Sequence, residues 1–167
     1  AASLAALPVL AQIAPQQFLL HFDPLCGHGL EALKGFARLQ QASGIPAALE
    51  LALPCRDDTA DELSRIAGQV RASRLTLSSL IVSPSVDLQS TPPGSKWPDC
   101  PPLQAVYAAA RSAFPDLRLG GGMLSYFTEL NRKRAPSQQL DFITHATNPI
   151  VHAADDLSVM QTLEALP

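Results

Sequence analysis

Short apolar runs recur along this chain at intervals of about thirty residues, and this rhythm constrains the fold more than any other feature. The runs cover residues 18–22, 47–53, 80–82, 117–119 and 141–146. Apolar residues at helical spacing lie between most of them, over residues 29–41, 57–70 and 103–113, and again after Asp156. Strands that alternate with helices form right-handed βαβ units. The chain is therefore predicted to be an α/β protein with about five βα units and a parallel sheet.

Two architectures agree with this order of elements. A five-stranded doubly wound sheet would be a complete domain, whereas a (β/α)₈ barrel typically needs ~250 residues. The 167 residues, of which 47% are hydrophobic, can bury one substantial core, so residues 1–167 are expected to be a single domain. Because the chain lacks an initiator Met and ends on a predicted helix, we expect it to be a fragment, and under the barrel architecture it would be a piece of a larger barrel domain. Both architectures place ligands at the carboxyl ends of the strands.

Composition excludes several classes of partner. The formal charge is −3 and the basic residues are scattered, so no nucleic-acid partner is expected. No apolar run approaches the ~20 residues that cross a bilayer, so no membrane partner is expected either. Three cysteines without a Cys-x-x-Cys spacing suggest neither a disulfide framework nor a thiolate zinc site. We expect a soluble protein in the reducing cytoplasm.

Polar residues gather where the predicted strands end. All four histidines lie on, or just beyond, a strand end, and several carboxylates and amides accompany them; the candidates for substrate contact or catalysis are His21, Asp23, Tyr126, Glu129, Asn131, His145, Asn148 and His152. Glu129 could be a general acid or base if burial tunes its pKa. It could equally be an exposed helical Glu paired with the basic residues that follow it.

The other candidates carry similar alternatives. His145 could act in the site or simply make a structural hydrogen bond, and either it or Thr144 should face inward. His21, Asp23 and His145 could be imagined as metal ligands, but no tight His-x-His pair occurs, and no metal or other cofactor is predicted. Tyr126 could stack on a sugar ring or only pack.

Two further features mark the region after the third and fourth strands. Gly120, Gly121 and Gly122 are predicted to end the fourth strand, either to approach a ligand or to allow a positive φ. The segment 83–102 contains six prolines and is too long for an ordinary connection, so it is expected to be a functional or flexible loop.

Two segments, Gly-Gly-Gly-Met-Leu-Ser-Tyr-Phe-Thr-Glu-Leu-Asn-Arg-Lys-Arg (120–134) and Asp-Phe-Ile-Thr-His-Ala-Thr-Asn-Pro-Ile-Val-His-Ala-Ala-Asp-Asp (141–156), resemble the D-apionate lactonase family. The resemblance implies a glycosidase-like (β/α)₈ barrel that hydrolyses D-apionolactone to D-apionate in the breakdown of apiose. It also implies that Glu129 is the proton-transferring carboxylate after the fourth strand, with Asn131 beside it. His145, Asn148 and His152 would then line the site from the fifth strand.

The leading functional hypothesis is a hydrolase of a sugar lactone that uses Glu129 as general base or general acid. One alternative is a glycoside hydrolase on the same barrel, which would need a second carboxylate. Another is a sugar-binding or structural module without catalysis. Association of two copies could cover the open sheet edges of such a partial barrel.

Overall fold

A single parallel sheet of five strands forms the centre of the molecule. The computed structural model describes residues 2–148 and 155–164. The strands are β1 (Phe18–Phe22), β2 (Ala47–Leu53), β3 (Ser79–Pro84), β4 (Arg118–Tyr126) and β5 (Phe142–Ala146). They lie in the order β1-β2-β3-β4-β5, and each neighbouring pair is parallel. The predicted α/β class and its five strands are therefore confirmed.

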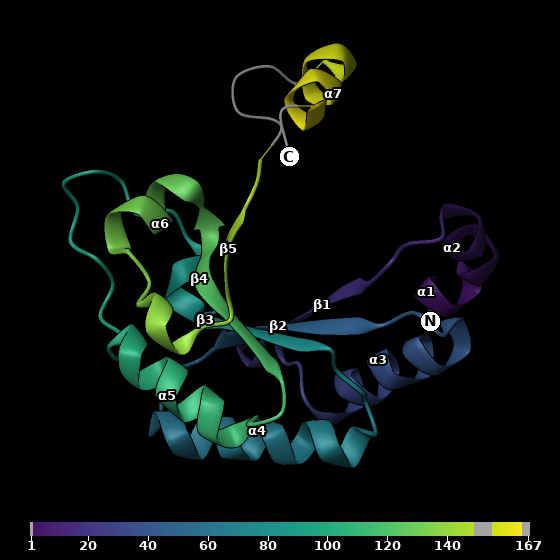
Figure 1. Ribbon diagram of the computed structural model, residues 1–167, viewed down its shortest axis with the longest axis horizontal. Coiled ribbons are helices and arrows are strands. Elements are labelled where there is room, and N and C mark those ends of the chain that lie inside the picture. Colours follow the sequence, from purple (N-terminus) through teal and green to yellow (C-terminus); the bar gives the residue numbers. More distant parts are fainter. Residues whose placement is uncertain (1, 149–154, 165–167) are drawn as a thin grey trace.

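Helices precede, connect and follow the strands. They are α1 (Ala2–Ala5), α2 (Leu7–Ile13), α3 (Leu30–Ser43), α4 (Thr59–Ser73), α5 (Leu103–Ala113), α6 (Phe127–Lys133) and α7 (Asp156–Glu164), with short 3-10 turns η1 (Pro24–Cys26), η2 (Ser85–Leu88) and η3 (Ser137–Gln139). Helices α3, α4 and α5 all lie below the sheet in Figure 1. Helix α4 begins where the Asp58 carboxylate accepts hydrogen bonds from the backbone N–H groups of Ala60 and Asp61.

The strand order decides between the two predicted architectures. A doubly wound sheet reverses its strand order at one point and carries helices on both faces, whereas a barrel adds each strand beside the previous one and keeps its helices outside. Here strand order equals chain order, and the crossover helices share one face (Figure 1). The sheet is therefore a part of a (β/α)₈ barrel.

Strand alternation separates a packed face from an open one. In β2, Leu49, Leu51 and Leu53 belong to the hydrophobic core between the sheet and the helices. On the opposite face, Leu19 of β1 is 58% exposed. The outer edges of β1 and β5 have no strand partner among the described residues. In a barrel, this open face is the interior.

The fourth strand differs from the prediction, which ended it at residue 119. The strand continues to Tyr126, and its glycines allow close packing against Phe142 of β5 and Tyr107 of α5. A Cβ at Gly120 would lie 2.2 Å from the Phe142 ring, and one at Gly121 would lie 2.5 Å from the Tyr107 ring. Only Gly122 has the positive φ that was expected, at 141°, and the register with β5 shifts after it.

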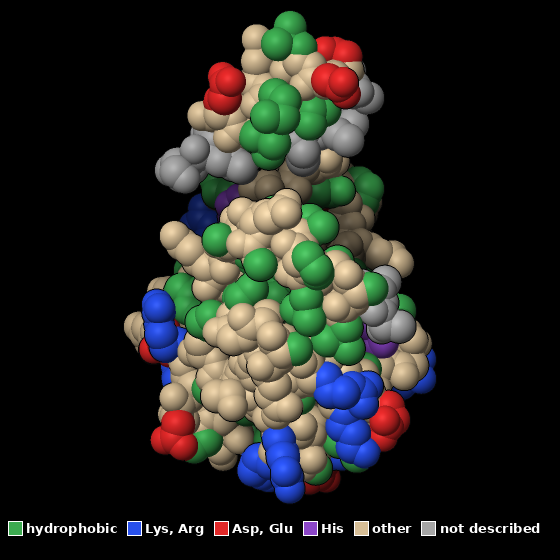
Figure 2. All heavy atoms as spheres, turned by 90° about the vertical axis from the view of Figure 1, so that its right-hand side faces the viewer, with side chains coloured by type: hydrophobic (Ala, Val, Ile, Leu, Met, Phe, Trp, Pro, Cys, Tyr) green, Lys and Arg blue, Asp and Glu red, His purple; other side chains and the backbone are tan. Residues whose placement is uncertain are grey.

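The N-terminal helices α1 and α2 were not predicted from the sequence. Val9 and Ile13 of α2 are exposed. Figure 2 faces this end of the molecule and shows hydrophobic side chains at the surface, with basic and acidic side chains interspersed towards the lower rim. Within the described ranges, no helix combines the length and the apolar character that crossing a membrane requires.

Candidate active site

Glu129 lies in the first turn of α6, immediately beyond the carboxyl end of β4. Its side chain is only 2% exposed, in contrast to the exposed helical Glu that was the alternative prediction. Oε1 accepts hydrogen bonds from the Ser90 hydroxyl at 2.6 Å and from Arg132 Nη2 at 3.0 Å. Oε2 accepts one from the Thr128 hydroxyl at 2.7 Å. The carboxylate is thus buried and hydrogen-bonded through both oxygens.

Opposing effects act on the proton affinity of Glu129. Burial is the largest and would raise the pKa of this carboxyl group. Hydrogen bonds from Ser90 and Thr128, together with the positive charge of Arg132, outweigh burial and leave the pKa below its usual value. Glu129 is therefore a carboxylate at neutral pH, so it can accept a proton but has none to donate.

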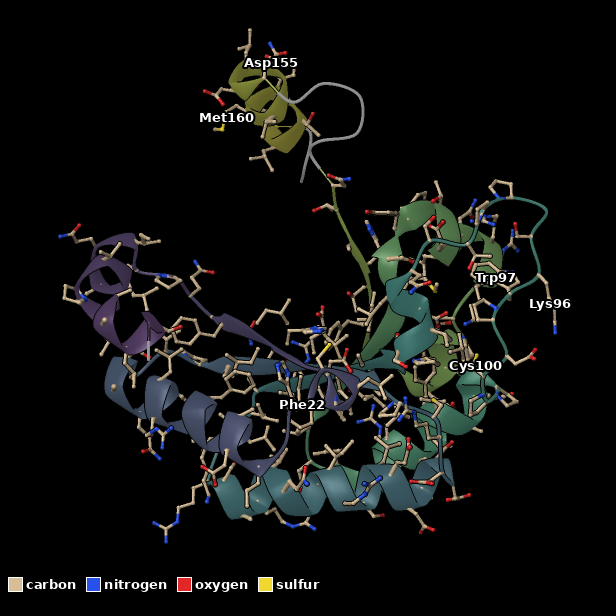
Figure 3. The ribbon with its side chains drawn as sticks, turned by 180° about the vertical axis from the view of Figure 1, so that it is seen from behind. Phe22, Lys96, Trp97, Cys100, Asp155 and Met160 are labelled. Carbon is tan, nitrogen blue, oxygen red and sulfur yellow. The ribbon has the colours of Figure 1, made fainter. Side chains whose placement is uncertain are left out.

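The proline-rich segment after β3 covers this carboxylate. Ser90 comes from that segment, and the backbone carbonyl of Thr91 accepts a hydrogen bond from Arg132 Nη2. Trp97, from the same segment, lies beside α6 (Figure 3), with its ring centroid 5.2 Å from Arg132 Cζ and 5.4 Å from Lys133 Nζ. The segment that was predicted to be functional or flexible therefore contacts Glu129 and Arg132, and its role in function stays a prediction.

A second buried carboxylate lies next to this cover. Asp87 of η2 is 1% exposed, and both of its oxygens accept hydrogen bonds from Lys133 Nζ, at 2.6 and 2.7 Å. Burial is the dominant effect and raises the pKa of Asp87, although Lys133 opposes it. The two basic residues after Glu129 thus bind different carboxylates, Arg132 that of Glu129 and Lys133 that of Asp87.

The glycine segment is held by two buried side chains of neighbouring elements. The Ser83 hydroxyl donates to the Gly122 carbonyl at 3.0 Å. The Gly122 N–H donates to the Tyr107 hydroxyl at 3.1 Å. These bonds fix the irregular part of β4 directly before the chain turns into α6. They therefore position the helix that carries Glu129.

At the end of β1, the two predicted site residues make local contacts. His21 Nδ1 lies 2.7 Å from Glu50 Oε1, its register partner on the open face of β2. Asp23 is buried and caps η1, accepting from the Leu25 N–H at 2.8 Å and from the Cys26 thiol at 3.2 Å. His21 and Asp23 thus contact different groups of the protein, and among the described residues no hydrogen bond or ion pair joins the two side chains. Glu50 was not among the predicted residues.

The register of β5 against β4 shows which residues of β5 face the barrel interior. Phe142 packs over Gly120 on the face away from α5, so alternation puts Thr144 on that face and His145 on the other. The ring of His145 contacts that of Phe127, with centroids 5.4 Å apart. Its Nδ1 lies 3.0 Å from the Ala146 carbonyl oxygen. A catalytic role for His145 stays a prediction.

The remaining predicted residues belong to the end of β4, to α6 and to the segment after β5. Asn131 and Asn148 are exposed, and Tyr126, 41% exposed, pairs with Ala146. His152 lies outside the described residues. No group of three or more potential metal ligands occurs in the ranges that the structure describes. Ser90 and Arg132, which contact Glu129 directly, were not predicted as site residues, although Arg132 has the i+3 spacing of a helical ion pair.

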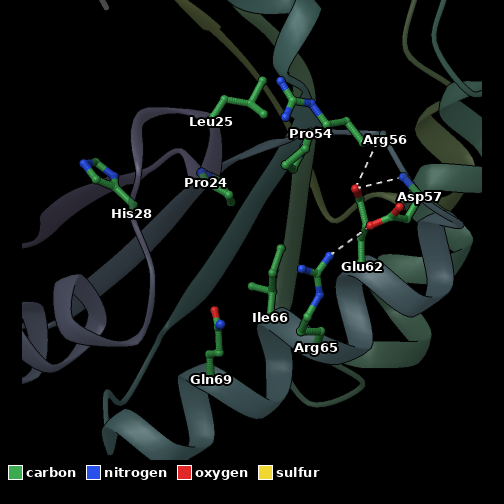
Figure 4. Close-up of a pocket in the computed structure, with 10 residues that line it drawn as sticks. All are labelled: Pro24, Leu25, His28, Pro54, Arg56, Asp57, Glu62, Arg65, Ile66 and Gln69. Atoms are coloured by element: carbon green, nitrogen blue, oxygen red, sulfur yellow. Dashed lines mark hydrogen bonds and ion pairs between the residues drawn. The ribbon is translucent and has the colours of Figure 1, made fainter.

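A separate cleft of about 390 Å³ opens between the loops after β1 and β2 and the first turns of α4 (Figure 4). Beneath it lies Glu62, which is 1% exposed and accepts hydrogen bonds from the backbone N–H groups of Cys55, Arg56 and Asp57 at 2.9 to 3.1 Å. Arg65 Nη2 lies 3.6 Å from Asp57 Oδ2. Glu129 is not among the residues that line this cleft.

The fold and the polar groups at the carboxyl edge define the class of this protein as a TIM-barrel chain, of which five βα units are present. A family model described as "D-apionate lactonase, TIM barrel domain" matches residues 1–167. The chain therefore belongs to the D-apionate lactonase family, as the resemblance predicted.

A curated relative supports the same assignment. The D-apionate lactonase of Brucella anthropi is 58% identical to this chain over 166 residues, which are 99% of the chain. These residues make up 27% of the relative. The chain thus spans about a quarter of the length of the protein that it matches.

Proposed function

We propose that the protein to which this chain belongs hydrolyses a sugar lactone of the D-apionolactone type and releases the open sugar acid. The observation that carries this proposal is a buried, ionised carboxylate, Glu129, beyond β4 of a barrel in the D-apionate lactonase family. The name of the Brucella anthropi relative supports the substrate class. Carbohydrate catabolism would be the setting, and three free thiols are compatible with a reducing, cytoplasmic one.

In the proposed reaction Glu129 acts as a general base. It accepts a proton from a water molecule while that water attacks the lactone carbonyl carbon. The oxyanion that forms then collapses, and the ring oxygen leaves as a hydroxyl after it receives the proton that Glu129 took from the water. The lowered pKa favours the base over the acid, which were both open from the sequence. Oε2 would take up the proton, because within the described residues it accepts one side-chain hydrogen bond, from Thr128, whereas Oε1 already accepts two.

The test compares the full-length protein with its Glu129→Gln variant, which keeps the shape of the side chain and removes the titrating group. Loss of a positioned general base lowers the rate by about 10²–10⁴-fold, so lactone opening should fall by at least about a hundredfold. Glu31→Gln is the matched control, because Glu31 lies exposed in the first turn of α3. Wild-type lactonase activity in Glu129→Gln would sink the catalytic role.

Parallel assays with aryl glycosides separate the enzymatic alternatives. A glycoside hydrolase would need two carboxylates ~5–10 Å apart and would cleave these substrates faster than the lactone. If neither substrate reacts while a sugar ligand still binds, the module without catalysis becomes the better description.

A further inference from the structure

Arg132 makes contacts in several directions at once. Its Nη2 donates to Glu129 Oε1 and to the Thr91 carbonyl, and its Nε donates to the Thr128 carbonyl at 3.2 Å. The Trp97 ring lies against the guanidinium from another side. The Arg132 side chain is 29% exposed, so these neighbours cover most of it. The Arg132 side chain thus links helix α6, the segment after β3 and the carboxylate of Glu129.

The chemistry of a guanidinium suits this task. It is planar, always charged and carries donors at fixed angles, so it can bind a carboxylate and two carbonyls while an indole stacks on it. A lysine ammonium would keep the charge but not the planar stacking or the fixed donor geometry. Two other charged groups of this region, Lys133 of α6 and Asp87 of η2, bind each other. Within the described residues, Arg132 is the cation that forms an ion pair with Glu129.

We propose that Arg132 is a positioning residue for Glu129, which holds the carboxylate in one orientation at the end of β4 and in its charged form. The inference rests on the proposed catalytic role of Glu129. Both Glu129 oxygens are already directed by hydrogen bonds, and a carboxylate fixed before the substrate arrives loses less orientational freedom during the reaction. The contacts with Thr91 and Trp97 restrain the guanidinium itself, so that its charge stays at Oε1.

The test is the pH profile of kcat/KM for lactone opening by the full-length protein. In Arg132→Met the cation is lost, so the Glu129 carboxylate is less favoured and its pKa rises. Because the base must be ionised, activity disappears as pH falls through that pKa. The acid limb should therefore move to higher pH by about one unit, which is the low end of the effect of an adjacent opposite charge. We also expect kcat to fall about tenfold or more with little change in KM.

Two further variants separate positioning from a general structural role. Arg132→Lys keeps the charge but loses the planar contacts, so the acid limb should return to near its wild-type position while kcat is restored only in part. Arg134→Met is the matched control, because Arg134 is exposed at the end of the same helix and, within the described residues, its side chain donates only to the Asn131 carbonyl. It should match the wild type in both kcat and pH profile.

The outcomes distinguish this inference from the proposed function. An acid limb that does not move in Arg132→Met, while Glu129→Gln is inactive, overturns the role of Arg132 and leaves that of Glu129 intact. An active Glu129→Gln overturns both. If Arg132→Met does not fold, Arg132→Lys decides alone: an unchanged limb with reduced kcat supports the inference, and wild-type kcat refutes it.

Discussion

Removal of the Glu62 carboxylate should destabilise the protein far more than removal of an exposed one. Glu62 lies in the first turn of α4 and binds three successive backbone N–H groups of the loop that follows β2. Cys55, the first residue of this loop segment, has a positive φ of 55°, which is unfavourable for a residue with a side chain. The carboxylate therefore holds a loop conformation that the backbone does not prefer by itself.

The magnitude follows from the contacts that Glu62→Ala would remove. A hydrogen bond to a charged group contributes about 1.5–3 kcal/mol to stability. Arg56 and Asp57 are exposed, so water can replace most of what their N–H groups lose, whereas Cys55 is half-buried. We therefore expect a loss of about 3 kcal/mol rather than three full hydrogen bonds. Glu31→Ala, which breaks one exposed ion pair with Lys34, should cost less than about 0.5 kcal/mol.

Urea unfolding at neutral pH, followed by circular dichroism, measures both variants against the wild type. Equal slopes with separated midpoints would attribute the difference to stability. The reasoning is refuted if Glu62→Ala is as mild as Glu31→Ala, because the three hydrogen bonds would then contribute nothing. Glu62→Gln should be intermediate, since its amide retains one acceptor but turns a donor towards one of the loop N–H groups.

Three other outcomes follow from buried or paired groups. Gly121→Ala should lower the free energy of unfolding by about 2–3 kcal/mol in the same urea assay, because its Cβ would overlap the fully buried Tyr107 ring; a loss below about 0.5 kcal/mol would show that the ring moves aside. Hydrogen bonds from Arg111 and the β4 backbone lower the pKa of Asp141 in the folded protein. Asp141 therefore stabilises the fold at pH values above its pKa in the unfolded chain, about 4, and this stabilisation is lost as the pH falls through its pKa in the folded protein. Asp141→Asn should therefore shift the urea midpoint at pH 7, with a difference that shrinks below about pH 4; a pH-independent difference would contradict this. Partial burial raises the pKa of Cys55 to about 12, so maleimide should label it much more slowly in the native protein than in urea at pH 8, and equal rates would contradict this shielding.

The strands and main helices were predictable because their apolar spacing is local. The run at 18–22 and the helical face of α4 appear in the structure at the predicted positions. The continuation of β4 was not predictable from local spacing. Gly120 and Gly121 have no room for a side chain because the rings of Phe142 and Tyr107 lie against them, and these two residues are distant in the sequence.

The candidate site shows the same limit. The position of Glu129 after the fourth strand was predicted, and its burial was not, because that depends on Ser90, 39 residues earlier in the chain. Hydrogen bonds across such distances leave no periodic signal. His145 illustrates a different difficulty: alternation predicted that it or Thr144 would face inward, but the choice needed the register of β5 against β4.

The strand order also bears on how the polypeptide folds as it is synthesised. Each strand pairs with the one made just before it, so no strand has to wait for a distant partner. Such nearest-neighbour pairing keeps loop closure as short as a parallel sheet allows, because each pairing spans only one crossover. A growing chain can then add one βα unit at a time to an edge that already exists.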